Sequence, residues 1–121
     1  MVFCYQSNAL QPVLVDFGKS EYVSSSRKFT LTDAKKVEYH QNHKHIAPDL
    51  VDGFAKPSPA SDIFSFGRLF KNVICYFPLN VSEIHASVKD IVKLCLKYNY
   101  VERPTCIAVI EVLSSCNTCT Q

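Results

Sequence analysis

The sequence predicts a mainly α-helical fold that begins with a small β-hairpin. Two short runs near the N-terminus, VFCYQ at 2–6 and PVLVDF at 12–17, have the β-branched and aromatic composition of strands. In the C-terminal half, apolar residues recur at intervals of three, four and seven positions, which is typical of helices that bury one face. A long polar stretch with no sustained period separates the two halves.

The SNAL segment at 7–10 suits the turn of a hairpin. Residues 19–45 are rich in Ser, Lys and His, and we expect a loop there with one helical turn near Thr32–Lys36. A second loop, APDLVDGFAKPSPAS at 47–61, is interrupted by proline and glycine.

Three helices are expected after these loops. Ser61 is expected to cap the first helix, which ends at Pro78. Its apolar positions are Ile63, Phe64, Phe66, Leu69, Phe70, Val73, Ile74 and Phe77, which predict burial on nearly all sides. The second helix is marked by Val88, Ile91, Val92 and Cys95. Thr105 is expected to cap the last helix, with a core stripe of Ile107, Val109, Ile110 and Leu113. The resulting organisation is a hairpin (1–18), a loop region (19–60), a helical core (61–117) and a tail (118–121).

Composition limits the function classes. The 121 residues are 47% hydrophobic and 20% charged, as in an ordinary globular protein, and the net charge is +2. This charge is too small to indicate nucleic-acid binding, and no apolar run is long enough for a membrane span. We therefore expect a cytoplasmic or nuclear protein whose partners are proteins rather than nucleic acids or membranes.

The cysteines and histidines do not indicate a metal site. Four of the six cysteines (Cys75, Cys95, Cys106 and Cys116) lie in or beside apolar helical stretches, where a reduced thiol packs as a small hydrophobe. Cys116 and Cys119 form a single CxxC without a second pair. His40, His43 and His45 lie close together in the loop, but without supporting carboxylates or thiols we expect them to face solvent.

Four motifs together carry a resemblance. VLVDFG (13–18), IAPDL (46–50), SDIFSFG (61–67) and ERPT (102–105) occur in the order, and at the approximate spacings, of landmarks in the large lobe of protein kinases. The chain therefore resembles a protein-kinase C-terminal lobe, of the serine/threonine or tyrosine-kinase-like groups. The resemblance implies that VFC follows the catalytic loop, so that the chain begins just past that loop.

The resemblance assigns roles to the DFG residues. Asp16 would bind Mg²⁺ on the phosphates of ATP, because a hard cation prefers carboxylate oxygen. Phe17 would be the packing switch and Gly18 the hinge. ATP and Mg²⁺ are thus the cofactors of the family, although we expect this chain to bind ATP only weakly. The alternative is a strand followed by a turn with no chemistry.

Three further residues receive structural roles. Asp49 stands where the family has the glutamate of Ala-Pro-Glu, and it would pair with Arg103 of the Arg-Pro motif. Aspartate is one methylene shorter, which puts a bidentate contact in doubt. Asp62 matches the helix aspartate that hydrogen-bonds the catalytic loop. Alternatively, Asp49 only caps a helix, and Asp62 is an acid favoured by the helix dipole.

The segment between DFG and Ala-Pro-Asp resembles an activation segment, in which phosphate groups pair with arginines. Tyr22 and Tyr39 also lie there. Candidate phosphorylation sites are Ser20, Ser24, Ser25, Ser26, Thr30 and Thr32, although a solvated loop also explains them.

Essential kinase parts are missing from the sequence. The only glycines are Gly18, Gly53 and Gly67, too far apart for a phosphate-binding loop, and no His-Arg-Asp tripeptide occurs. We therefore expect a fragment of a kinase domain without catalytic activity, which lacks its N-terminal lobe or self-associates. One alternative is a pseudokinase-like, non-catalytic interaction module. Another is an unrelated helical adaptor, in which ERPT and SDIFSFG lie far apart.

Overall fold

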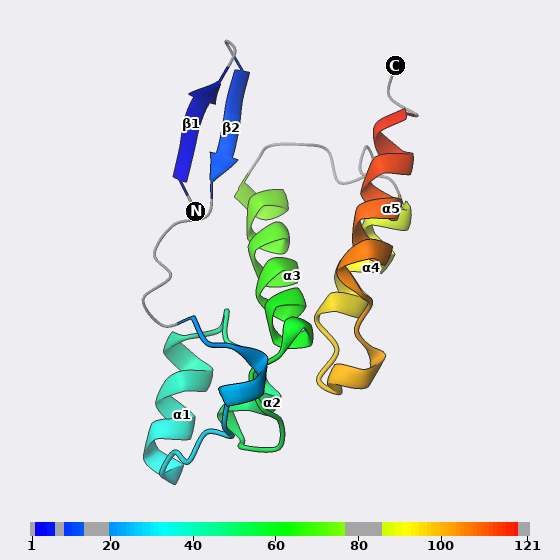
Figure 1. Cartoon of the computed structure of the whole chain (residues 1–121). Helices are drawn as coiled ribbons and strands as arrows, with labels where there is room; N and C mark the ends of the chain where they lie inside the picture. The colour runs from blue at the N-terminus through cyan, green and yellow to red at the C-terminus, as the bar shows by residue number, and fades with distance from the viewer. Residues whose placement is uncertain (1, 7–8, 14–19, 77–85, 119–121) are drawn as a thin grey trace.

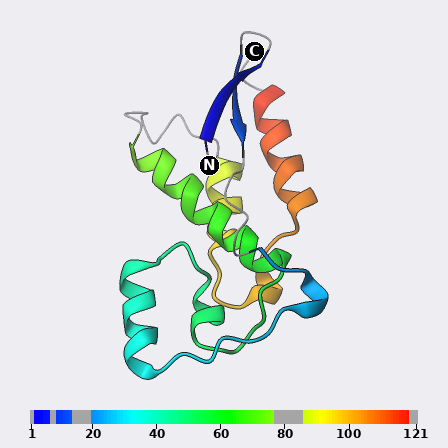
Figure 2. The ribbon, with the colours of Figure 1, turned by 60° about the vertical axis from the view of Figure 1, so that its left-hand side comes forward.

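The computed structural model describes residues 2–6, 9–13, 20–76 and 86–118, and this part of the chain is mainly helical (Figure 1). Strands β1 (Val2–Gln6) and β2 (Ala9–Val13) pair antiparallel, with Val2 opposite Val13 and Gln6 opposite Ala9. The second strand thus begins three residues earlier than the sequence predicts, and residues 14–17 lie outside the described part. The strand pair and helices α1 and α2 lie at opposite ends of the molecule (Figures 1 and 2).

The polar segment after the strands contains more helix than we expected. A short 3-10 turn, η1, spans Val23–Ser25, and helix α1 spans Asp33–Asn42 in place of a single turn. Thr32 caps α1, because its hydroxyl accepts a hydrogen bond from the Lys35 backbone N–H. No residue of α1 is buried, so the hydrophobic periodicity that identifies most helices is absent here.

Helix α2 is a single turn, Pro48–Val51, within the region expected to be a loop. Its end requires Gly53, whose φ of +79° lies in the left-handed region. A Cβ atom at this position would lie 3.0 Å from the Phe29 carbonyl oxygen, so the chain before α1 passes directly over the turn.

Helix α3 spans Pro59–Tyr76 and begins earlier than predicted. Ser61 therefore lies inside the first turn instead of capping the helix. Its hydroxyl accepts a hydrogen bond from the Ser58 backbone N–H and donates one to the Ser58 carbonyl oxygen. Proline suits the first position of a helix, since its missing N–H has no partner there in any helix. The predicted end at Pro78 lies outside the described residues.

The remaining helices are α4 (Ala86–Cys95) and α5 (Cys106–Thr118), connected through the 3-10 turn η3 (Tyr100–Glu102). Thr105 caps α5 as predicted, accepting a hydrogen bond from the Ala108 N–H. The predicted stripe of α5 is only partly right. Val109 is buried, but Ile107 and Ile110 are 70% and 56% exposed. No helix among the described residues is both long and apolar enough to cross a membrane.

The buried residues form two clusters. One joins α3, α4 and α5, with Ile63, Val88, Ile91, Val92, Cys95 and Val109. The other joins α2 to α3, with Ala47, Leu50, Ala55 and Phe64. Leu96 packs against both. Burial around α3 is less complete than predicted, since Leu69 and Val73 are exposed.

Helices α3 and α4 approach closely at Gly67. A Cβ atom there would lie 2.6 Å from the Cys95 Cβ atom, closer than two such atoms can stand. Cys95 is completely buried and its thiol is free, in agreement with the packing role predicted for it. The same prediction is wrong for Cys106, whose free thiol is exposed. The side chains of Cys75, Cys116 and Cys119 lie outside the described part of the structure.

Candidate functional site

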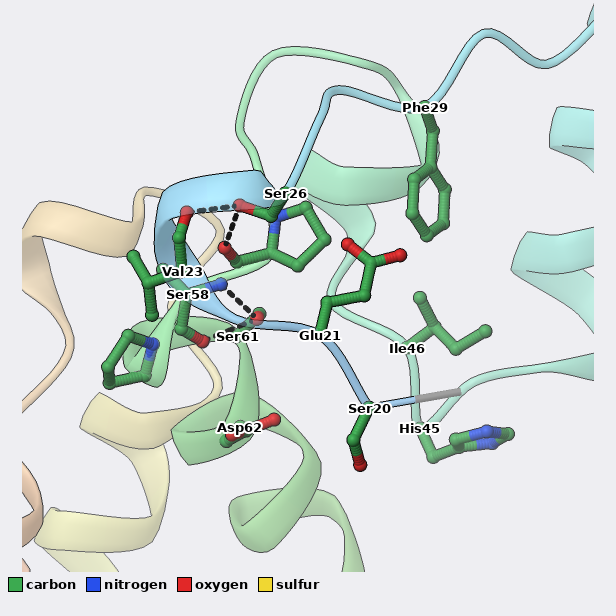
Figure 3. Close-up of a pocket in the computed structure, with 12 residues that line it drawn as sticks. Ser20, Glu21, Val23, Ser26, Phe29, His45, Ile46, Ser58, Ser61 and Asp62 are labelled. Atoms are coloured by element: carbon green, nitrogen blue, oxygen red, sulfur yellow. Dashed lines mark hydrogen bonds between the residues drawn. The ribbon is translucent and has the colours of Figure 1, made fainter. Parts of the chain in front are cut away.

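The candidate site is a pocket of about 770 Å³ between the segment before α1 and the start of α3 (Figure 3). Three stretches of chain line it: residues between Ser20 and Phe29, the pair His45 and Ile46, and residues between Pro57 and Asp62. Apolar and polar side chains both contribute. A volume of this size is within the usual range for ligand sites.

Hydrogen bonds between these stretches hold the walls in place. The buried Ser26 hydroxyl lies 2.9 Å from the Val23 carbonyl oxygen and 3.2 Å from that of Pro57, and it donates to this pair. It thereby joins η1 to the chain just before α3. Ser65 similarly donates to the His45 carbonyl oxygen at 2.7 Å, which joins α3 to the chain before α2.

Two carboxylates contribute to the pocket. Glu21 belongs to the segment before η1 and Asp62 to the first turn of α3. In Figure 3 the Glu21 side chain points toward the side where Phe29 lies. Both residues are exposed, and neither makes a hydrogen bond or ion pair within the part of the chain that the structure describes. Among the residues that the structure describes, no Lys or Arg side chain lines this pocket. Glu21 was not identified from the sequence.

Next to the pocket, the structure brings Asp49 and Arg103 together. The Arg103 Nη2 atom lies 2.7 Å from Asp49 Oδ1, and both side chains are almost completely buried. The contact is monodentate, as the shorter aspartate side chain suggested, since Asp49 Oδ2 is buried with no hydrogen-bond partner.

Arg103 makes further contacts besides its bond to Asp49. It donates to the carbonyl oxygens of Ala60 (3.0 Å), Lys97 (2.8 Å) and Tyr98 (3.0 Å). Its guanidinium carbon lies 5.2 Å from the centre of the Phe64 ring, a cation–π distance. ERPT and SDIFSFG are therefore in contact, and the prediction of the unrelated-adaptor alternative, that they lie far apart, is wrong.

A second polar network lies around Asp52, the residue after α2. His40 Nε2 is 2.8 Å from Asp52 Oδ1, and the Tyr98 hydroxyl donates to Asp52 Oδ2 at 2.6 Å. Burial raises the pKa of Tyr98, and the bond to the Asp52 carboxylate raises it further, to about 12. Burial also raises the pKa of Asp52, but the bonds from Tyr98 and His40 outweigh it and leave that pKa below its ordinary value.

The sequence did not identify this network because its members are far apart in the chain. No local motif joins His40, Asp52 and Tyr98. The one available signal is general: Tyr and His side chains can both hydrogen-bond a carboxylate. His43 contacts the rings of Tyr39 and His45 edge to face. Among the described residues, no group of three or more His, Cys, Asp or Glu side chains could hold a metal ion.

The DFG residues Asp16, Phe17 and Gly18 lie outside the described residues. The role of Asp16 as a ligand of Mg²⁺ therefore stays a prediction. Asp62 lies in the first turn of α3, as expected for an acid near the positive end of a helix.

The predicted phosphorylation sites differ in accessibility. Ser20, Ser24, Ser25, Thr30 and Thr32 are exposed. Ser26 is only 6% exposed and its hydroxyl is engaged, so a kinase could reach it only after local unfolding. The Ser25 hydroxyl donates to the Tyr22 carbonyl oxygen, and that of Thr32 caps α1.

Comparison with known proteins gives no assignment. No family model, no curated protein and no solved structure matches this chain.

Proposed function

We propose that this chain is the helical part of a protein-kinase domain, and that it does not transfer phosphate by itself. The observation that carries the proposal is the buried pair between Asp49 and Arg103, which are 54 residues apart in sequence. The motif resemblance anticipates this pair. A chance occurrence of the same short motifs would give no reason for their acid and guanidinium groups to meet.

The contact between Arg103 and the Ala60 carbonyl oxygen supports the same proposal, since it places ERPT against the beginning of SDIFSFG. The exposed position of Asp62 supports it too. In the family this acid hydrogen-bonds the catalytic loop, and the present sequence contains no His-Arg-Asp tripeptide. Its carboxylate lines the pocket and makes no hydrogen bond to another described residue.

Catalysis by this chain alone is not expected. Phosphoryl transfer depends on the joint positioning of the phosphates, two metal ions and the substrate hydroxyl. The sequence offers Asp16 for one of these tasks and lacks the Gly-rich loop and the His-Arg-Asp base. Purified protein with labelled ATP should give no transfer to itself or to added protein.

A chimera tests the proposal directly. Residues 1–121 would be joined to the upstream part of a protein kinase that carries the Gly-rich loop, the strand lysine, the helix glutamate and the His-Arg-Asp loop. We expect Mg²⁺-dependent phosphate transfer that is lost in Asp16→Asn and retained in Asp33→Asn, a matched change in the first turn of α1. A chimera that melts cooperatively yet does not bind Mg²⁺–ATP would contradict the proposal.

A further inference from the structure

Helix α1 has no apolar face buried in the core. None of its ten residues is buried, and a helix of this length is only marginally stable in water by itself. Its cap at Thr32 and its ion pair between Lys35 and Glu38 act within the helix and do not attach it to another element. A side-chain bond from α1 to the rest of the chain can therefore change how firmly the helix is held.

Such a bond joins His40, near the end of α1, to Asp52, the residue after α2. The His40 Nε2 and Asp52 Oδ1 atoms are 2.8 Å apart, and the two side chains are 40% and 27% exposed. Tyr98 fixes the acceptor, because its hydroxyl donates to the other carboxylate oxygen, Oδ2, at 2.6 Å. One oxygen of Asp52 is thus held by Tyr98, and the second is left for His40.

We propose that this contact is a pH-dependent device, in which protonation of His40 between pH 8 and pH 5.5 strengthens the bond to Asp52 and holds α1 more firmly against the turn after α2. Histidine is the side chain that ordinarily titrates in this range. A protonated ring makes a charge-assisted hydrogen bond to a carboxylate, which is about twice as strong as a neutral one. The neutral ring can donate from Nε2 in only one of its two tautomers.

The two partners of His40 keep their charge over this range. Burial raises the pKa of Asp52, but the bonds from Tyr98 and His40 outweigh it, so the carboxylate stays ionised at pH 5.5. Burial and the bond to Asp52 raise the pKa of Tyr98 to about 12, so the phenol stays neutral at pH 8. The contact therefore gains strength in acid and loses it as the pH rises toward 8.

Other charged groups lie around the contact. The Lys36 charge also acts on Asp52, and the Asp49 carboxylate, which acts on Tyr98, is paired with Arg103. Lysine, arginine and ionised aspartate ordinarily keep their charges between pH 5.5 and 8. The same holds for the further charged neighbours on this stretch of chain, Glu38 and Lys44.

Two more histidines have to be separated from His40. The His43 and His45 rings are in edge-to-face contact, with centres 6.1 Å apart. Protonation of both rings would place two positive charges side by side, and their repulsion would loosen this stretch in acid. Their effect is therefore opposite in sign to the one proposed for His40.

Amide hydrogen exchange, followed by NMR at pH 5.5 and pH 8, measures how often α1 opens. Observed rates are divided by the intrinsic rate at each pH, and the amides of α4 report changes in global stability. We expect the protection of α1 amides, relative to α4, to be about threefold higher at pH 5.5, as for a partly exposed ion pair. The inference does not depend on the kinase assignment proposed above.

Three variants assign the effect. His40→Gln keeps a donor that does not titrate, and Asp52→Asn keeps the shape of the acceptor without its charge. Both should show equal protection of α1 at the two pH values. His43→Gln is the matched control, because it removes a neighbouring titrating ring and leaves the contact intact. It should retain the threefold difference.

Several outcomes would overturn the inference. One is equal protection of α1 at both pH values in the unaltered protein. Another is a pH response that persists in His40→Gln, or one that is lost in His43→Gln. If α1 does not form in His40→Gln, Asp52→Asn decides, since a threefold difference that remains there would show that the carboxylate plays no part.

Discussion

Arg103 donates a hydrogen bond to only one oxygen of the Asp49 carboxylate, and the other oxygen, Oδ2, is buried without a partner. Removing one partner of a buried ion pair leaves an uncompensated charge, which typically costs about 3–5 kcal/mol. We expect Arg103→Ala to lower the free energy of unfolding by about this amount, measured by urea denaturation followed by circular dichroism. The control is Arg68→Ala, which removes a half-buried arginine and is measured in the same way. An equal loss in both variants would contradict a special role of Arg103.

Because Asp49 Oδ2 has no hydrogen-bond partner, we expect a longer acidic side chain at position 49 to increase stability. Glutamate is one methylene longer and can bring both oxygens to the guanidinium, so Asp49→Glu should raise the free energy of unfolding by about 1 kcal/mol. Asp49→Asn keeps the size of the side chain and removes its charge, and it should be destabilising. If the two variants are equally destabilised, the shortness of the aspartate is not the reason for the unpartnered oxygen.

Gly67→Ala is predicted to destabilise the protein, against the usual preference of helices for alanine, which is about 1 kcal/mol. The added Cβ atom would stand 2.6 Å from the Cys95 Cβ atom, so α3 and α4 must separate. Overpacking of this kind costs about 1–3 kcal/mol. The measurement is thermal unfolding of Gly67→Ala, Cys95→Gly and the double variant.

Cys95→Gly removes the atom that Gly67→Ala would contact. The double variant should therefore be more stable than the sum of the two single effects predicts. Simple additivity would mean that the two helices do not meet at these residues.

Alkaline pH should weaken the fold through Tyr98. Its pKa is raised from 10.0 to about 12, so the neutral phenol is favoured in the folded state. The stability that this provides is complete below pH 10 and is lost as the pH rises toward 12. Free energies of unfolding measured between pH 8 and 12 should fall more steeply for the unaltered protein than for Tyr98→Phe. Parallel curves would contradict this prediction.

The exposed isoleucines of α5 predict self-association. Ile107 and Ile110 are three positions apart, and both are largely exposed. Exposed apolar groups that lie together promote association. Light scattering over a range of concentrations should detect oligomers, and Ile107→Lys with Ile110→Lys should reduce them. If the protein is monomeric at every concentration, the surface around Ile107 and Ile110 does not drive self-association.

Some elements were predictable because their signals are local. Thr105 precedes an apolar run and caps α5, and the buried positions of α4 follow a clear period. Helix α1 was largely missed, since it has no buried face for periodicity to reveal. Its signals are weaker: the cap at Thr32 and the ion pair between Lys35 and Glu38.

The orientation of α5 was harder to predict for the opposite reason. It is apolar on several sides, so spacing alone does not indicate whether Val109 or Ile110 faces the core. The pair of Asp49 and Arg103 was anticipated through motifs, not through composition. The network around Asp52 includes a bonded pair, Asp52 and Tyr98, that is 46 positions apart, and only the folded chain brings its members together.

Tyr98 is linked to two acidic residues, Asp49 in α2 and Asp52 just after it. The link to Asp49 runs through Arg103, and the link to Asp52 is a direct hydrogen bond. The Tyr98 carbonyl accepts from Arg103, which holds Asp49, and the hydroxyl donates to Asp52. A four-residue helix is too short to persist by itself. Because Asp49 is held through Arg103 and the following Asp52 through the Tyr98 hydroxyl, α2 cannot rotate about its axis without breaking both links, so it keeps a fixed angle to α3.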